Sequence, residues 1–163
     1  MKYPYDFINQ VIQGDCLEVM KEIPDKSIDL VLTDPPYGIN YQSNARMEKF
    51  DYIANDDNLN FVAPLFLELT RIMKENSCLY CFASWNNCES FIAETKKQLT
   101  LKSLLILPKR KPNMGDLDSY SNNYQMCLFA TKGKVKLNKL KEYRVSDTTL
   151  SDRRYIGDGF LYR

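Results

Sequence analysis

Apolar runs alternate along this chain with segments of helical periodicity. The run at 28–33 is typical of a buried strand, and residues 59–74 place apolar side chains on one helical face and charged ones on the other. Short strands are also predicted at 11–16 and 101–107, and helices at 17–24 and 89–98, the last capped by Asn86 and Asn87. This order favours an α/β fold with crossover connections and a mainly parallel sheet.

A carboxylate, two prolines and an aromatic ring follow the strand predicted at 28–33. The residues are Asp34, Pro35, Pro36 and Tyr37, and Gly38 comes next. The prolines fix φ and remove two amide donors, so the strand must stop here and its flanking side chains have little freedom. A planar ligand with an amino group could stack on Tyr37 while its amine donates to Asp34. The alternative is a plain turn in which Tyr37 covers the end of the sheet.

Composition narrows the setting of this turn. With 163 residues, one domain is expected. The net charge of +1 gives no global basic field, so any nucleic-acid affinity must come from local clusters. The chain has five cysteines and no histidine, which favours free thiols in a reducing compartment over a metal site. Neither a leader segment nor a membrane span is recognisable, so a cytoplasmic location is expected.

The segment at 34–37 resembles the Asp-Pro-Pro-Tyr motif of DNA amino-methyltransferases, which use S-adenosylmethionine. Three other segments are similar to that family in the same order: the lead-in at 11–24 with its Gly14-Asp15 pair, a following strand at 77–85, and a last strand at 124–134. The resemblance covers most of residues 8–134. It implies a Rossmann-like methyltransferase fold.

Within the family, the chain is similar to the circularly permuted group in which the tetrapeptide half comes first. That group continues to a His-Pro-Thr type motif and a Phe-x-Gly-x-Gly strand, and neither is found here. Gly157-Asp158-Gly159 follows no apolar strand, so a turn is the simpler interpretation. We therefore expect an incomplete fold, with residues 1–133 as the catalytic half and 134–163 as a weakly patterned tail or the start of a target-recognition segment. The chain would be a truncated product or a subunit that needs a partner.

The resemblance implies methyl transfer to the exocyclic N6 amine of adenine in DNA, with cytosine N4 as the alternative. Asp34, Pro35, Pro36 and Tyr37 form the expected catalytic set, in which Asp34 and the Pro35 carbonyl accept from the target amine. On the S-adenosylmethionine side, Asp15 is the expected acceptor for the cofactor's adenine amine, together with Cys16 and Asp34. Asp15 could instead cap the helix that starts near residue 17, and both roles could coexist.

Contacts to DNA are expected from Tyr37, by stacking, and from basic residues in two segments. These are Arg46 and Lys49 in the polar loop 39–58, and the cluster Lys109, Arg110 and Lys111, which could equally be a solvated surface. A second hypothesis is that the chain is a non-catalytic binding or regulatory subunit, or an inactive remnant. An incomplete parallel sheet would leave an edge exposed, so the chain should form a homo-oligomer or capture a complementary subunit.

Overall fold

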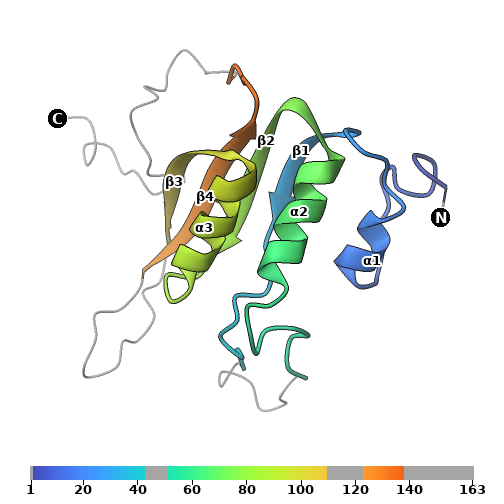
Figure 1. The fold of residues 1–163 in the computed structure, drawn as a ribbon. Coiled ribbons are helices and arrows are strands. Elements are labelled where there is room, and N and C mark those ends of the chain that lie inside the picture. Colours follow the sequence, from blue (N-terminus) through green and yellow to red (C-terminus); the bar gives the residue numbers. More distant parts are fainter. Residues whose placement is uncertain (1, 43–50, 110–122, 138–163) are drawn as a thin grey trace, which may run out of the picture.

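The computed structural model describes residues 2–42, 51–109 and 123–137. This part of the chain contains three helices and four strands (Figure 1). Their bounds are Cys16–Met20 for α1, Ile28–Thr33 for β1, Val62–Ile72 for α2, Met73–Ala83 for β2, Cys88–Gln98 for α3, Thr100–Pro108 for β3 and Tyr124–Lys132 for β4. The domain boundary near Gly133 stays a prediction, because residues 138–163 lie outside the described residues.

The strands form one sheet in the order β1-β2-β4-β3. β1 and β2 are parallel, whereas β4 is antiparallel to both β2 and β3. Three strands therefore run in one direction and β4 runs against them. The predicted α/β class is confirmed, but the expectation of mainly parallel pairing needs correction. Parallel neighbours need a crossover, which α2 supplies between β1 and β2; after β3 the chain instead reverses and inserts β4 between β2 and β3.

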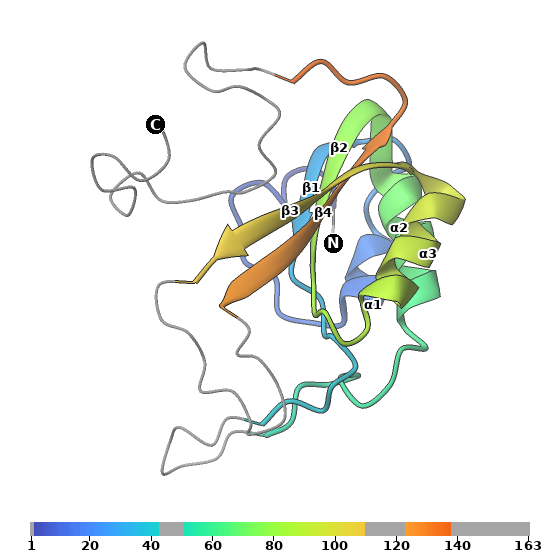
Figure 2. The same cartoon turned by 90° about the vertical axis from the view of Figure 1, so that its left-hand side faces the viewer.

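All three described helices lie on one face of this sheet (Figures 1 and 2). The helix predicted at 59–74 is found as α2, and its buried stripe consists of Val62, Leu65, Phe66, Leu69 and Ile72. This stripe packs against the alternate β2 side chains Leu79, Cys81 and Ala83. Full burial of a large apolar side chain contributes about 1.5–3 kcal/mol, so this two-layer core holds the sheet to α2 and α3.

The opposite face of β1 is largely uncovered. Leu30 and Leu32 are 54% and 67% exposed, while Val31 between them is buried in the core. Side chains alternate along a strand, so Leu30 and Leu32 point away from the helices. No described helix covers them, and β1 has no described strand on its outer edge.

The prediction of a strand at 11–16 is wrong. Residues 11–15 adopt no strand, and the side chain of Val11 is fully exposed. A strand needs a neighbour for its main-chain hydrogen bonds, and the described sheet ends at β1, so this segment has no neighbour. The helix predicted at 17–24 is found as α1, which is shorter and ends at Met20.

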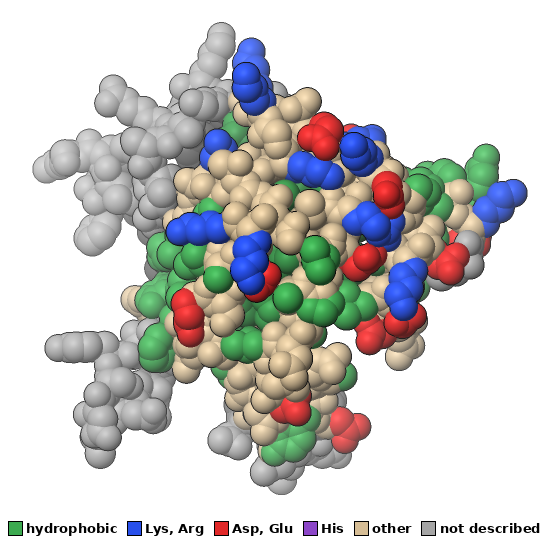
Figure 3. Space-filling model, in the orientation of Figure 1, with side chains coloured by type: hydrophobic (Ala, Val, Ile, Leu, Met, Phe, Trp, Pro, Cys, Tyr) green, Lys and Arg blue, Asp and Glu red, His purple; other side chains and the backbone are tan. Residues whose placement is uncertain are grey.

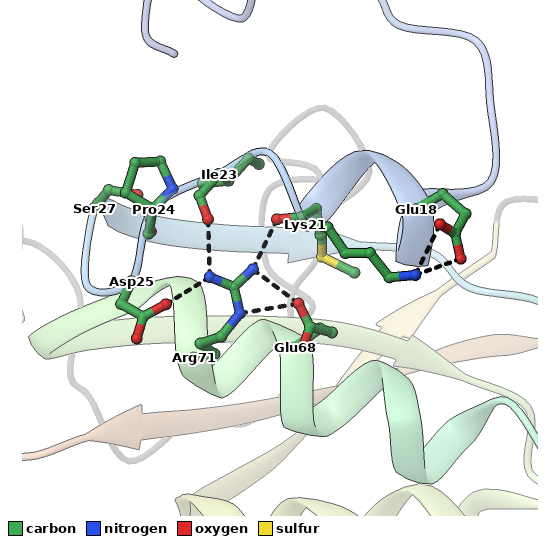
Figure 4. A network of polar contacts seen from close by, with 9 residues as sticks. Glu18, Lys21, Ile23, Pro24, Asp25, Ser27, Glu68 and Arg71 are labelled. Atoms are coloured by element: carbon green, nitrogen blue, oxygen red, sulfur yellow. Dashed lines mark hydrogen bonds and ion pairs between the residues drawn. The ribbon is translucent and has the colours of Figure 1, made fainter. Parts of the chain in front are cut away.

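Arg71 at the end of α2 joins the helix to the connection between α1 and β1 (Figure 4). Its guanidinium donates to the main-chain oxygens of Met20 at 2.7 Å and Ile23 at 2.9 Å. It also donates to the carboxylates of Asp25 at 2.6 Å and Glu68 at 2.8 Å. These contacts fix the chain just before β1 enters the sheet, and so they set where β1 and the turn after it lie.

We expect Arg71→Met to lower the free energy of unfolding by about 1.5–3 kcal/mol, because two carbonyls and two carboxylates lose their shared donor. Urea unfolding followed by circular dichroism would measure it. Lys97→Met is the matched control, since the exposed side chain of Lys97 forms an ion pair with Glu94 one helical turn away, and it should cost no more than about 0.5 kcal/mol. Equal effects of the two substitutions would contradict a special role for Arg71.

Candidate functional site

The turn at 34–38 lies where β1 ends, beside the end of β2. Asp34 is exposed, Pro35 is buried and Tyr37 is half-buried. The parallel register pairs Thr33 with Cys81, so the residues after β1 meet the last residues of β2 at one edge of the sheet. Ligands bind at this carboxyl edge in α/β folds. The predicted placement of Asp34 at a strand end is confirmed.

The hydroxyl of Tyr37 connects three strands. It donates to Oδ1 of Asp34 and accepts from Nε2 of Gln125 at 2.9 Å. The same Gln125 amide donates to the Ala83 carbonyl at 3.4 Å. The end of β1, the end of β2 and the start of β4 are therefore linked through one phenol, with the carboxylate and the ring held side by side. Sequence reasoning missed Gln125, which lies 88 residues from Tyr37 along the chain.

The surroundings of this hydroxyl keep it protonated. Burial raises the pKa of the Tyr37 phenol well above its ordinary value, and the hydrogen bond to Asp34 and the charge of that carboxylate raise it further. Burial also raises the pKa of Cys81 to about 12 and that of Cys127 to about 11, with Asp34 contributing to both. The thiols of Cys81 and Cys127 are thus neutral at pH 7. Nucleophiles and metal ligands are thiolates, so these two groups are not suited to either role.

A buried carboxylate, Asp56, lies under the turn. It is 2% exposed. Its Oδ1 accepts from the main-chain amides of Tyr37 at 2.7 Å and Gly38 at 2.9 Å, and its Oδ2 accepts from the amide of Tyr41 at 2.7 Å. In the sequence, Asp56 sits in the polar run at 55–58, which is indistinguishable from an ordinary solvated loop. Sequence reasoning therefore missed this residue.

Asn87 contacts the same turn from the other side. Its side-chain amide donates to the carbonyls of Tyr37 at 2.8 Å and Gly38 at 3.1 Å. It occupies the position before α3 but makes no side-chain capping bond there. Asn87 is thus the N-cap residue, as predicted, but its side chain accepts no capping bond, because the bonds of its amide nitrogen to the carbonyls at 37–38 orient the side chain toward the turn.

Asp15 lies at the start of α1. Its Oδ1 accepts from the main-chain amide of Leu17 at 2.8 Å, so the capping role is confirmed. The predicted cofactor contact of Asp15 stays a prediction, as does that of Cys16. Cys16 is an exposed residue as a whole. Its thiol is partly buried, and this burial together with the charge of Asp15 raises the pKa of the thiol.

Few of the predicted DNA contacts fall in the described part of the chain. Lys109 is exposed directly after β3, and its main-chain amide donates to the Asn123 carbonyl at 2.6 Å. The other predicted basic contacts, Arg46, Lys49, Arg110 and Lys111, lie outside the described residues. On the face drawn in Figure 3, acidic and basic side chains are interspersed over the described surface, with no broad basic field.

Two further findings concern the described ranges. They contain no cluster of three or more histidine, cysteine or acidic side chains that could hold a metal ion. None of their helices is long and apolar enough to span a membrane.

Known proteins are similar to this chain in sequence and in fold. Residues 28–158 match the model of the N6/N4 methyltransferase family, described as DNA methylase. By sequence the chain is similar to the DNA adenine methyltransferase YhdJ of Escherichia coli (strain K12), with 25% identity over 122 residues. That match covers 75% of this chain and 40% of YhdJ.

Two solved structures share the fold. The crystal structure of the M1.HpyAVI-SAM complex has a TM-score of 0.59 and 18% identity, over 87% of this chain and 66% of that one. The PvuII DNA methyltransferase, titled cytosine-N4-specific, has a TM-score of 0.62 and 11% identity, over 85% and 55%. The expected Rossmann-like methyltransferase fold is thereby confirmed. The chain spans only part of the length of each of these proteins.

The raised pKa of Tyr37 predicts a pH-dependent stability. The unfolded chain loses this proton near the ordinary value of 10.0, before the folded chain does. The stabilisation is therefore complete below about pH 10 and is lost as the pH rises through the folded pKa. Between about pH 9.5 and 11.5, the wild type should lose more unfolding free energy than Tyr37→Phe does.

Urea unfolding at several pH values would measure this difference. Tyr5→Phe is the control, because it removes a phenol that is 76% exposed, and it should follow the wild type. If the curves of wild type and Tyr37→Phe run parallel over this pH range, the phenol is not held protonated by its surroundings.

Proposed function

Since the chain belongs to the DNA methylase family of N6 and N4 methyltransferases, we propose that it transfers a methyl group from S-adenosylmethionine to the N6 amine of adenine in DNA. The observation that carries the proposal is the pairing of Asp34 with Tyr37 at the carboxyl edge of the sheet. Pro35 and Pro36 lie between these two residues. Because each proline fixes its φ, they limit the conformational freedom of the turn.

The exocyclic amine of a nucleobase is a poor nucleophile, because its lone pair is delocalised into the ring. Asp34 and the carbonyl of Pro35 can each accept one amine hydrogen, which frees the lone pair to point at an electrophilic methyl. The exposure of Asp34 leaves it open to such a donor. After transfer the cationic amine sheds its proton readily, so Asp34 need not act as a full general base.

The turn can supply part of the free energy that base extrusion requires. A charge-assisted hydrogen bond to Asp34 is worth about 1.5–3 kcal/mol, and stacking of a base on Tyr37 about 1–3 kcal/mol. Flipping a base out of duplex DNA costs a few kcal/mol. The turn can therefore offset extrusion only together with contacts to the flanking DNA, for which we propose Arg46, Lys49, Lys109, Arg110 and Lys111.

The described residues fit one end of the cofactor. Asp15 is held by its bond to the Leu17 amide, and its second carboxylate oxygen faces no described donor, so it can accept from an adenine amine. We propose that Asp15, Cys16 and Asp34 contact S-adenosylmethionine. When bound, the cofactor supplies a methyl group on a positively charged sulfur. The negative charge of Asp34 favours such a cation nearby.

Adenine is preferred over cytosine on two grounds. The tetrapeptide begins with Asp34, which leans toward adenine N6 within the family, and YhdJ is named an adenine methyltransferase. Cytosine N4 is the alternative, because the PvuII enzyme with the same fold is titled cytosine-N4-specific.

The five cysteines are all unpaired, which fits a reducing compartment and a cytoplasmic enzyme.

A second candidate function is that of a subunit which completes its cofactor pocket with another polypeptide. The uncovered Leu30 and Leu32 and the unpaired outer edge of β1 favour it. A strand edge flanked by exposed leucines is suited to accept a further strand from a second copy or a complementary chain.

Transfer of a labelled methyl group to unmethylated DNA of mixed sequence tests the first function, with the modified nucleosides identified afterwards. We expect label in N6-methyladenine. Asp34→Ala should lower the rate by about 10- to 150-fold, because it removes a charge-assisted hydrogen bond.

Asp29→Ala is the matched control, since Asp29 is an exposed carboxylate of β1 that pairs with Lys74 on β2. It should retain the wild-type rate. Label in N4-methylcytosine would overturn the choice of adenine, and an equal loss in both variants would overturn the role of Asp34.

The subunit function predicts that the chain alone binds no S-adenosylmethionine and sediments above its monomer mass. Leu32→Lys should shift it toward the monomer, because a charge replaces an exposed apolar contact on β1. Titration calorimetry and sedimentation equilibrium measure the two properties. A wild-type monomer that binds the cofactor and transfers methyl groups would exclude this function.

A further inference from the structure

We propose that Asp56 is the positioning residue of the catalytic turn: its buried carboxylate holds the main chain at 37–41 and thereby fixes Asp34 and Tyr37 for the target amine. The inference rests on the proposed function and adds to it a residue outside the Asp-Pro-Pro-Tyr motif. Asp56 is 2% exposed, so it is shielded from substrate and acts through the turn.

The carboxylate is engaged by main-chain amides on both of its oxygens. Oδ1 accepts from Tyr37 and Gly38, and Oδ2 accepts from Tyr41, at 2.7 to 2.9 Å. The main-chain oxygen of Asp56 also accepts from the amide of Asn40 at 2.6 Å. Four main-chain amides between residues 37 and 41 therefore bond to Asp56.

The charge of this group makes the attachment strong. No described lysine or arginine pairs with Asp56, so the three amide dipoles are its compensation within the described chain. A buried carboxylate without donors is very unfavourable. Any movement of the turn that breaks these bonds would leave such a group, and the turn is therefore restricted to one position.

Gly38 makes the convergence of amides possible. Its φ is +68°, a left-handed conformation in which its amide and that of Tyr37 point at the same oxygen. A Cβ at this position would lie 2.6 Å from Cδ2 of Leu59 and 3.1 Å from the carbonyl of Asn58. A glycine is thus favoured after Tyr37 both by the left-handed φ and by the close approach of residues 58 and 59.

Asn87 restrains the same peptides from their carbonyl side, with bonds of 2.8 and 3.1 Å to Tyr37 and Gly38. Amides held by Asp56 and carbonyls held by Asn87 leave the turn little rotational freedom. The side chains of Asp34 and Tyr37 are then presented in one arrangement.

The test compares Asp56→Asn with Asp57→Asn in the full chain. The first is nearly isosteric but cannot accept on both sides, whereas Asp57 is exposed and bonds only to its neighbour Asn58 among the described residues. In Asp56→Asn, hydrogen exchange at the amides of Tyr37, Gly38 and Tyr41 should speed up about tenfold or more. The amides of α2 should keep their wild-type rates.

Two functional readouts separate positioning from stability. Asp56→Asn should lower kcat for methyl transfer about tenfold or more while the KM for S-adenosylmethionine stays within about twofold. The 13Cζ resonance of Tyr37, assigned with Tyr37→Phe, should titrate at lower pH, because the phenol no longer keeps its place beside Asp34. Asp57→Asn should match the wild type in all three readouts.

Unchanged exchange at the three amides, or faster exchange with an unchanged kcat and an unchanged Tyr37 titration, would overturn the inference. If Asp56→Asn does not fold, Asp56→Glu keeps a carboxylate but moves it away from the amides of Tyr37, Gly38 and Tyr41, and the same outcomes apply to it. Exchange and titration need no catalysis. A wild-type chain without methyl transfer would therefore defeat the proposed function while these two readouts still decide the role of Asp56.

Discussion

The parallel pairing of β1 with β2 is the constraint on which the site depends. It brings the end of β1 beside the end of β2, and β4, inserted next to β2, delivers Gln125 to the same edge. Asp34, Tyr37 and Gln125 are therefore neighbours because of strand direction and register. The core under α2 and the contacts of Arg71 hold this register by fixing the chain before β1 and after it.

The polar groups at this edge have complementary roles. Tyr37 stays protonated, and its hydroxyl donates to the carboxylate of Asp34. Asp56 contributes a second carboxylate, which is buried and accepts from main-chain amides of the turn. Asp34 is thus exposed beside the phenol, whereas Asp56 is buried and bonds to the main chain of the turn.

Local sequence signals predicted much of this structure. The helical periodicity at 59–74 identified α2, the apolar run at 28–33 identified β1, and the two prolines marked the turn at 34–38. The contacts with the turn that sequence reasoning missed are distant in sequence: their partners Asp56, Asn87 and Gln125 lie 19, 50 and 88 residues from Tyr37. The misplaced strand at 11–16 has the same origin, because strand formation depends on a neighbour that no local pattern reveals.

The contact between Tyr41 and Asp56 has an evolutionary consequence. The chain leaves the turn at Tyr41 and comes back to it at Asp56, whose carboxylate is 2.7 Å from the Tyr41 amide. Any excursion between these residues begins and ends at the same place. Its closure entropy grows only slowly with length, so insertions and sequence changes there need not disturb Asp34. Variation in the sequence between these two fastened ends is therefore separated from the geometry of the turn that carries Asp34 and Tyr37.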